Sequence, residues 1–459
     1  MKSSREADGL RIGYITGQAK RLNERVIDNQ WVGYLAKHAE LVPIPPLQLF
    51  RMFGGTIERF RRSFPHSLER LSSGISELRD RYGIRTLYMN VPSLLPYLMM
   101  GRAQAGADLG FLGIAHCAGS ESWMRQWLGI APFLSERDVL LCSSEASLTA
   151  LRRISDRYRT MSLIPLCTAL RDRDEAERAI AGRNGTRLLS IGRLEDVKNI
   201  DSLLRIFAKL KKELPQAILT IAGEYTGMRP GQAELYKERL LEIVRSLELE
   251  ASVRFAGPVD GEEKERLFRA ADLLVNLSTD PGETFGYNLI EAKVWGVPVL
   301  CANWNGFREV VSHGEDGLLI DCEWPDDGGL PRLREDQAAE WAVRLLRDER
   351  LRAAMSGCAA ERAGLYDYET VFPRISAAIA RAESSKASTH RAQTGEWMLG
   401  TLSELPDAYH VDSLRRLPFF EEPLIDIVSG ASTLPLREWM PAIRPIIGHY
   451  AGRFSYAEL

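Results

Sequence analysis

The chain alternates short apolar runs, rich in β-branched residues, with longer amphipathic segments, and this alternation occurs twice along its 459 residues. The pattern predicts strands joined by helices, and connections of this length produce parallel sheets with helices on both faces. At roughly 100 to 200 residues per domain, a chain of this length suggests about two to four domains. We therefore expect an α/β protein with two doubly wound sheets in tandem.

The first half contains apolar runs that we interpret as strands, at residues 10–16, 40–45, 84–90, 107–116, 138–143 and 161–166. Helical segments lie between them at 120–128 and 144–157, and residues 51–82 form a long arginine-rich amphipathic region. The polar stretch RDRDEAERAIAGRNG (171–185) then interrupts the apolar pattern. We interpret this stretch as a linker, which predicts a first domain over residues 1–182.

The second half has the same pattern in a sharper form. Its predicted strands are at residues 186–192, 217–223, 253–257, 272–278, 297–302 and 317–321. In the helical segment 234–249, Leu235 and Leu240 fall on the face that we expect to pack against the sheet. We expect a second domain over residues 183–385 and, after it, an extension over 386–459 in which no motif indicates a role.

Composition narrows the class of function. The 59 basic and 62 acidic residues almost cancel, which gives no sign of a nucleic-acid-binding surface. The six cysteines form no C-x-x-C pair, so neither a zinc knuckle nor a disulfide framework is predicted. The opening MKSSREADGLRIGYI has no apolar core of signal-peptide length, and no stretch of about 18 apolar residues could span a bilayer. We expect a cytoplasmic protein that binds no nucleic acid, and the composition leaves its oligomeric state open.

The stretch ETFGYNLIE (283–291) carries two glutamates with seven residues between them. Glu283 falls in the loop after the strand at 272–278, and Glu291 falls on the helix that leaves this loop. Glycines at 282 and 286 let the backbone approach a ligand, and the N-terminus of the helix favours negative charge. A nucleotide sugar fits both features, because it offers a diphosphate to the helix and hydroxyls to the carboxylates.

A second motif, GRLEDVKN (192–199), follows the strand at 186–192. Its two cations, Arg193 and Lys198, fall in the neighbouring strand-to-helix loop. Arginine binds phosphate as a bidentate donor and lysine as a point charge, so the pair is suited to neutralising a diphosphate. The alternative is that both residues are solvated loop charges.

These motifs occur in a familiar order. GRLEDVKN, the glycine after AILTIAG, VRFAG and ETFGYNLIEAKVWGVPVL resemble the nucleotide-binding domain of glycosyltransferase family 4. The resemblance covers about residues 186–375 and stops before 386. It is weaker in the first half of the chain, where the stretches similar to strand regions of the family are DLGFLGIAH and RDVLLCSSEASLTALRRI. It implies a GT-B fold, in which two Rossmann-like doubly wound domains face a central cleft, here with a C-terminal helical extension.

The resemblance also implies roles for individual residues. Glu283 would contact the hydroxyls of the donor sugar, Arg193 and Lys198 the diphosphate, and His116 the region near the sugar. The residues that would bind the nucleotide sugar by ribose, backbone amide or glycine contacts are Glu291, Phe285, Gly286, Tyr287, Asn288, Gly17 and Gly223. The chain departs from the family around Gly17, where TGQAKRLN has one glycine in place of the usual pair, and its acceptor loop has no recognisable counterpart. His116 has an alternative interpretation as a core residue at the end of a strand.

The implied reaction is a retaining transfer of a hexosyl group from a nucleotide sugar, a UDP-sugar rather than a GDP-sugar, to a hydroxyl acceptor in glycan, glycolipid or polysaccharide biosynthesis. The resemblance implies no tightly bound cofactor and no required metal ion, and we interpret the triplet Asp172-Arg173-Asp174 as a solvated charge run rather than a metal-binding motif. No second carboxylate is evidently placed to form a covalent glycosyl-enzyme, which favours front-face attack.

Two alternatives remain open for the function: an enzyme of the same fold that makes a soluble disaccharide or small-molecule glycoside, and a catalytically degenerate nucleotide-binding scaffold. The segment FRMFGGTIERFRRSF (50–64) has two interpretations as well. It predicts either a peripheral contact with the inner membrane face or a helix on the surface of the first domain.

Overall fold

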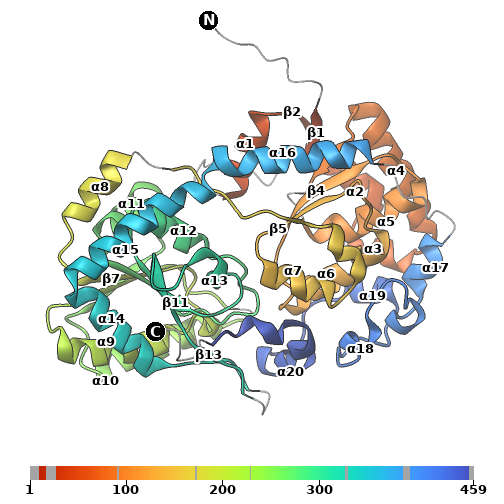
Figure 1. Cartoon of the computed structure of the whole chain (residues 1–459). Coiled ribbons are helices and arrows are strands. Elements are labelled where there is room, and N and C mark those ends of the chain that lie inside the picture. The colour runs from red at the N-terminus through yellow and green to blue at the C-terminus, as the bar shows by residue number, and fades with distance from the viewer. Residues whose placement is uncertain are drawn as a thin grey trace, which may run out of the picture. The chain divides into compact units, whose positions relative to one another are not determined.

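The computed structural model describes residues 10–16, 27–89, 92–170, 173–227, 229–325, 329–385 and 393–453. The chain forms two compact units (Figure 1). Unit 1 comprises Met1–Ile164 and Phe372–Ile447, and unit 2 comprises Pro165–Val371 and Gly448–Leu459. Each unit contains a six-stranded parallel sheet, which confirms the predicted α/β class with two doubly wound sheets.

The sheet of unit 1 has the strand order β2-β1-β3-β4-β5-β6. Its strands are β1 (Arg11–Ile15), β2 (Glu40–Ile44), β3 (Thr86–Tyr88), β4 (Gly110–Ala115), β5 (Val139–Cys142) and β6 (Ser162–Leu163). Each lies inside one of the predicted apolar runs. The central strands β3 and β5 are buried along their whole length, as expected for strands covered on both faces.

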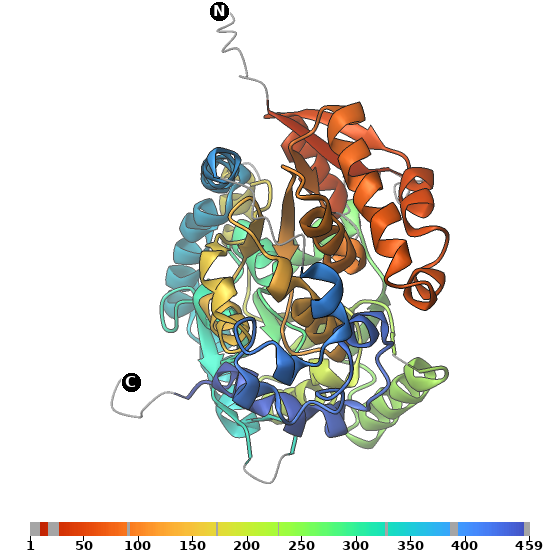
Figure 2. The same cartoon turned by 90° about the vertical axis from the view of Figure 1, so that its right-hand side faces the viewer.

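Helices cover this sheet and continue into the C-terminal extension. They are α1 (Ile27–Ala36), α2 (Pro46–Phe53), α3 (Ile57–Arg62), α4 (His66–Tyr82), α5 (Leu95–Ala105), α6 (Glu121–Ile130), α7 (Glu145–Arg152), α17 (Thr394–Leu399), α18 (Val411–Leu414), α19 (Leu424–Ser429) and α20 (Leu436–Ile447). Helix α4 lies beside α5 (Figure 2). Its residues Leu71, Ile75 and Leu78 are buried in the core. In the extension, α19 packs against α6 and α3, so most of this region is part of unit 1.

The segment 50–64 forms parts of α2 and α3 rather than one long helix. Met52, Phe53 and Phe60 are buried in unit 1, whereas Phe50 is 56% exposed. Half of the six large apolar side chains of this segment therefore belong to the core, and a membrane contact through it stays a prediction. Within the described part of the chain, no helix combines the length and the apolar character needed to cross a bilayer.

The sheet of unit 2 has the strand order β12-β11-β10-β7-β8-β9. Its strands are β7 (Arg187–Ile191), β8 (Ile218–Ala222), β9 (Val253–Gly257), β10 (Leu273–Asn276), β11 (Val299–Ala302) and β12 (Gly317–Ile320), and β13 (Cys322–Glu323) pairs antiparallel with β14 (Arg332–Leu333). The helices are α8 (Arg173–Ala181), α9 (Ile200–Glu213), α10 (Gln232–Ser246), α11 (Gly261–Ala270), α12 (Tyr287–Val294), α13 (Phe307–Val310), α14 (Glu335–Arg347), α15 (Glu349–Arg362) and the start of α16 (Tyr368–Ser384). Each predicted strand of the second half again contains an observed one.

Helix α10 shows where the helical periodicity misleads. Leu240 is fully buried as predicted, but Leu235 is 68% exposed. The helix begins at Gln232, so Leu235 lies in its first turn, where its position on the helical face does not bring it into the core. Periodicity identifies the apolar face of a helix. The length of the elements that pack against this face decides which of its turns are buried.

The observed boundary between the units differs from the predicted one. Unit 2 begins at Pro165 rather than at residue 183, and the expected linker contains helix α8. This helix packs against α11 and α15, and the guanidinium of Arg183 donates a hydrogen bond to the carbonyl of Trp295 at 2.6 Å. The charged residues of this stretch resemble a linker, but Ala176 is buried, which places α8 in the layer of helices on unit 2.

Two glycines end the adjacent strands β7 and β8 in nearly the same backbone conformation. Gly192 has φ 150° and Gly223 has φ 149°. Residues other than glycine rarely adopt these backbone angles. Their surroundings differ. A Cβ on Gly223 would lie 1.7 Å from the carbonyl oxygen of Gly192, whereas a Cβ on Gly192 would meet no atom within 4 Å.

This difference makes a matched pair of variants. Gly192→Ala should lower the free energy of unfolding by about 1–3 kcal/mol through backbone strain alone. Gly223→Ala should cost about 1–3 kcal/mol more, because the added methyl group also collides with the neighbouring strand end. Urea unfolding of the two variants measures the difference, and equal destabilisation would refute the close approach.

Candidate functional site

A pocket of about 310 Å³ lies in unit 2 at the carboxyl ends of β7 and β10. These strands are neighbours in the sheet and run parallel, so the loops that follow them meet at one edge, where doubly wound sheets bind ligands. The lining residues are Ser190, Ile191, Gly192, Arg193, Leu194, Lys198, Ile200, Lys264, Asn276, Leu277, Asp280, Gly282, Glu283, Gly286, Tyr287, Asn288 and Glu291.

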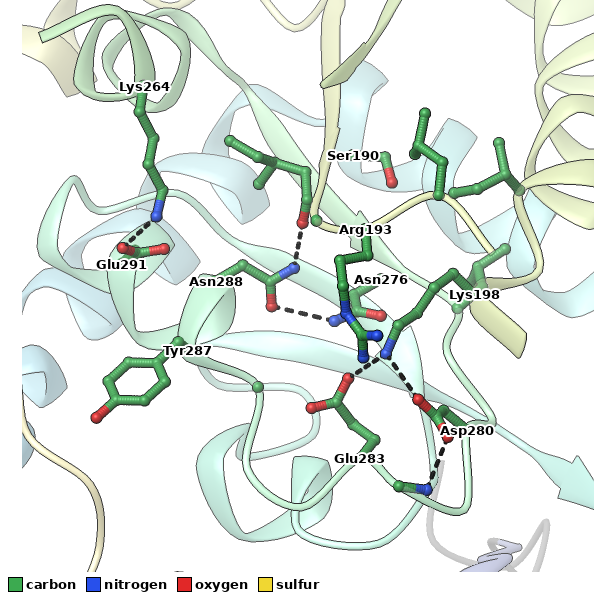
Figure 3. Close-up of a pocket in the computed structure, with 17 residues that line it drawn as sticks. Ser190, Arg193, Lys198, Lys264, Asn276, Asp280, Glu283, Tyr287, Asn288 and Glu291 are labelled. Atoms are coloured by element: carbon green, nitrogen blue, oxygen red, sulfur yellow. Dashed lines mark hydrogen bonds and ion pairs between the residues drawn. The ribbon is translucent and has the colours of Figure 1, made fainter. Parts of the chain in front are cut away.

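Lys198 lies at one end of the pocket, near the end of the connection from β7 to α9. Its ammonium group donates hydrogen bonds to Glu283 at 2.8 Å and to Asp280 at 3.2 Å (Figure 3). It also donates to the hydroxyl of Ser278 at 3.3 Å. Burial opposes the charge of Lys198, but the carboxylates of Glu283 and Asp280 outweigh it and raise the pKa of this amine above its ordinary value. Lys198 is therefore a permanently charged group that joins the two loops.

Arg193 points into the same end of the pocket (Figure 3). Its side chain is 61% exposed and forms an ion pair with Glu195 at 2.7 Å. An exposed arginine with one partner keeps most of its donors available, because a guanidinium carries five N–H groups. This end of the pocket thus presents one buried and one exposed cation.

The loop between β10 and α12 has a defined turn. Asp280 accepts a hydrogen bond from the backbone N–H of Gly282 at 2.7 Å, and the N–H of Glu283 donates to the carbonyl of Asp280 at 2.9 Å. Gly286 precedes the first residue of α12 with φ 78°, which glycine adopts at little cost. Phe285 is 2% exposed and packs against the ring of Tyr366, so it anchors the loop to the core of unit 2.

Glu291 lies at the other end of the pocket, where it pairs with Lys264 of α11 at 2.6 Å (Figure 3). Burial raises the pKa of Glu291, although the charge of Lys264 acts in the opposite direction. Between the two ends, the amide of Asn288 donates to the carbonyl of Ile191 at 2.7 Å and accepts from Asn276 at 3.1 Å. Asn288 thereby ties α12 to the ends of both β7 and β10.

The structure brings together in this pocket most of the residues predicted for the nucleotide sugar. These are Arg193, Lys198, Gly286, Tyr287, Asn288, Glu283 and Glu291. Phe285 supports the loop and does not line the pocket. Gly223 lies against the backbone of Gly192 and does not line the pocket either. His116 follows β4 in unit 1, with its ring centroid 4.6 Å from that of Trp123. Gly17 lies outside the described residues, as does Asp172.

Sequence reasoning missed Asp280, Ser278 and Lys264. Ser278 ends the predicted strand at 272–278, and Asp280 lies in the loop before the quoted stretch 283–291. Both fall outside the spacing of the two glutamates, and polar residues after a strand are common in any loop. Lys264 belongs to the charged segment GEEKERLF, which is typical of a solvated helix face. Only the tertiary structure reveals that this lysine pairs with Glu291.

Residues 172–329 match the protein family described as Glycosyl transferases group 1. This segment contains every residue that lines the pocket. Over these residues the chain is similar to a group 1 glycosyltransferase domain. The resemblance to family 4 in the second half of the sequence is thereby confirmed.

Individual relatives are similar over larger or smaller parts of the chain. The D-inositol 3-phosphate glycosyltransferase of Rhodococcus erythropolis is 29% identical over 309 residues, which cover 63% of this chain and 65% of the relative. The mannosylfructose-phosphate synthase of Agrobacterium fabrum is 33% identical over 153 residues, which cover 33% of each protein. The chain thus spans less than two thirds of the length of either relative.

The fold has a counterpart among solved structures. The structure of HepE from Anabaena in complex with UDP and glucose matches 81% of this chain and 99% of its own, with a TM-score of 0.58 and 17% sequence identity. At this identity the likeness concerns the fold alone. It confirms the predicted GT-B architecture, in which each of two α/β domains contains a parallel sheet.

The two cations of the pocket should differ in their contribution to stability. Lys198→Met leaves Asp280 and Glu283, whose side chains are 15% and 19% exposed, without their shared cation, and should lower the free energy of unfolding by about 1–3 kcal/mol. Arg193→Met is the matched control, because its exposed charge should contribute less than about 0.5 kcal/mol. Denaturant unfolding compares the two, and equal stabilities would contradict the proposed ion-pair network.

Proposed function

We propose that this protein transfers a hexosyl group from a UDP-sugar to a hydroxyl acceptor, with retention at the anomeric carbon and without a required metal ion. The observation that supports this proposal is the arrangement of charge in the pocket of the group 1 domain. Arg193 and Lys198 lie at one end with Glu283, and Glu291 lies at the other end. The pocket thus offers cations to a diphosphate and carboxylates to the hydroxyls on either side of it.

The donor would exchange partners with the protein. A diphosphate beside Lys198 takes over the ammonium group that Glu283 and Asp280 hold, and the N-terminus of α12 adds a favourable dipole. Glu283 is then able to accept hydrogen bonds from the hydroxyls of the sugar, while Glu291 accepts them from the ribose diol. The ion pairs of the pocket therefore keep the charges in position before the donor binds.

The same charges would act during the reaction. Breaking the bond between the anomeric carbon and the phosphate oxygen leaves negative charge on the diphosphate, which Arg193 and Lys198 stabilise, while the sugar becomes oxocarbenium-like. The acceptor oxygen attacks from the side of the leaving group, forms the new glycosidic bond and gives its proton to the departing phosphate oxygen. Configuration at the anomeric carbon is retained because both bonds lie on the same face.

Asp280 is a second carboxylate in this region that the sequence did not indicate. Its carboxylate lies in the pocket, but one oxygen accepts from Lys198 and the other from the N–H of Gly282. A carboxylate held in this way organises its loop and is poorly suited to attack the sugar as a nucleophile. Front-face attack thus remains the mechanism that we propose.

Relatives suggest which donors and acceptors to test first. HepE has been crystallised with UDP and glucose, which supports a UDP-sugar donor. The two relatives described above are named for inositol phosphate and mannosylfructose phosphate, which favours small phosphorylated acceptors as a second candidate beside glycans and glycolipids. Acceptor binding by unit 1, with contributions from Gly17 and His116, stays a prediction.

The experiment that tests the proposal has two steps. Thermal shifts with UDP, GDP and their sugar derivatives identify the nucleotide, and mass spectrometry of reactions with candidate acceptors identifies the product. The anomeric proton coupling in the product reports retention or inversion.

Turnover should survive EDTA, and loss of activity that magnesium or manganese restores would refute metal independence. Binding of a UDP-sugar without transfer to any acceptor would favour the scaffold alternative.

Replacing Glu283 should separate binding from transfer. Glu283→Gln should bind UDP at least as tightly as the wild type, because Lys198 loses a competing carboxylate, but should transfer the sugar about 100-fold or more slowly. Isothermal titration and initial rates measure the two effects. Glu263→Gln, which changes an exposed glutamate of α11, is the control. Turnover close to that of the wild type would exclude a role of Glu283 at the sugar.

Replacing Glu291 should change the pH dependence of donor binding. Because burial raises the pKa of Glu291, its carboxylate is protonated at a higher pH than that of an exposed glutamate, and wild-type affinity for the UDP-sugar should fall as the pH is lowered into this range. Glu291→Gln should weaken binding at pH 7.5 by about 1.5–3 kcal/mol and respond less to pH. Titrations between pH 5 and pH 8 measure both effects. Parallel curves for the two proteins would contradict the ribose role.

A further inference from the structure

The end of the C-terminal extension belongs to a different unit from the rest of it. The extension is part of unit 1 as far as Ile447, and from Gly448 onward it is part of unit 2. Here a turn of 3-10 helix, Gly448–Tyr450, leads into Ala451, which forms an antiparallel bridge with Trp304. Gly452 completes the contact, because its N–H donates to the carbonyl of Asn303 at 2.8 Å and its carbonyl accepts from the N–H of Cys322 at 3.0 Å.

Tyr450 is the centre of this contact. Its side chain is fully buried, and its ring meets that of Trp304 edge to face at 5.8 Å between centroids. Its carbonyl accepts hydrogen bonds from the N–H of Asn305 at 2.9 Å and from the guanidinium of Arg308 at 3.2 Å. The chain end is therefore held by packing and by main-chain hydrogen bonds together.

The residues that receive the chain end also hold the loop of the pocket. The indole N–H of Trp304 donates to the carbonyl of Asp280 at 2.9 Å, and the side-chain amide of Asn305 donates to the carbonyl of Glu283. Trp304 and Asn305 thus fasten the pocket loop at both of the residues whose carboxylates bind Lys198. A continuous chain of contacts runs from Tyr450 to the ion pairs of the pocket.

The backbone of Asn305 supports this view. Its φ of 46° lies in the left-handed region, which asparagine adopts more readily than most non-glycine residues. The residue is fully buried, and its N–H and its side-chain amide bind different segments: Tyr450 on one side and Glu283 on the other. Asn305 therefore couples the chain end to the pocket loop directly.

We propose that residues 449–452 form a clasp that positions the loop from Asp280 to Glu283 for binding of the donor. Tyr450, Trp304 and Asn305 act as positioning residues, since they touch the loop or one another and do not line the pocket. The identity of the donor rests on the function proposed above. The role assigned to the clasp also gives the extension a function that its sequence did not indicate.

Four variants test the clasp. Tyr450→Ala removes the ring against Trp304, and Asn305→Gly removes the side-chain amide while tolerating the left-handed backbone. Two controls change the same segment without breaking the contact. Tyr450→Phe keeps the ring, and Arg453→Ala removes an ion pair with Glu323 whose side chains are 61% and 59% exposed.

Hydrogen exchange of the loop amides at 278–286 is the first measurement, and it needs no ligand. Tyr450→Ala and Asn305→Gly should raise exchange in this loop about tenfold or more while amides of β7 and β8 keep their protection. The second measurement is the affinity for UDP together with kcat and KM for the donor. Both variants should weaken UDP binding and lower kcat by about 10 to 100-fold, as expected from a displaced functional loop. The controls should match the wild type in both measurements.

The outcomes separate the clasp from the function on which it rests. If Tyr450→Ala and Asn305→Gly lower the melting temperature but leave loop exchange and UDP affinity unchanged, the chain end is only structural and the clasp is refuted. If Tyr450→Ala does not fold, Asn305→Gly decides by the same two measurements. If the wild type binds no nucleotide, the proposed function fails, whereas the exchange data still support or refute the clasp.

Discussion

The pocket of unit 2 depends on the charge of Lys198. This lysine follows β7, whereas its partners Ser278, Asp280 and Glu283 follow β10, so one ammonium group draws two loops together. Burial would make a lone charge costly here, and the two carboxylates offset that cost. The same argument applies to each carboxylate. The pairing thus holds the charges in position for a ligand that replaces one set of partners with another.

The support for this pairing extends outward through the backbone. Asp280 and Glu283 are held at their carbonyls by Trp304 and Asn305, and these residues are held by the carbonyl and ring of Tyr450. Main-chain contacts leave the carboxylates themselves directed at the pocket. A loop that binds ligands needs such support, because loops have few internal contacts of their own.

The family of the domain and the geometry of the pocket carry different parts of the functional conclusion. The match of residues 172–329 to a glycosyltransferase family points to the class of protein, while the charges at the two ends of the pocket support the proposal of how a nucleotide sugar would bind. Fold alone supports many chemistries, so the charges of the site are the stronger argument. The residues of this pocket are assigned to the donor, and the acceptor is proposed to bind to unit 1.

The sequence by itself determined the class of fold, the succession of strands, the loops that carry Arg193, Lys198 and Glu283, and the helix that carries Glu291. Hydrophobic periodicity and glycine placement are local properties that a chain displays along its length. Only the tertiary structure decided that Lys264 faces Glu291, that the charged stretch at 171–185 contains a packed helix, and that Tyr450 supports the pocket loop. These relations join segments that are distant in the chain, and contacts of that kind depend on which surfaces meet in three dimensions rather than on any pattern of neighbouring residues.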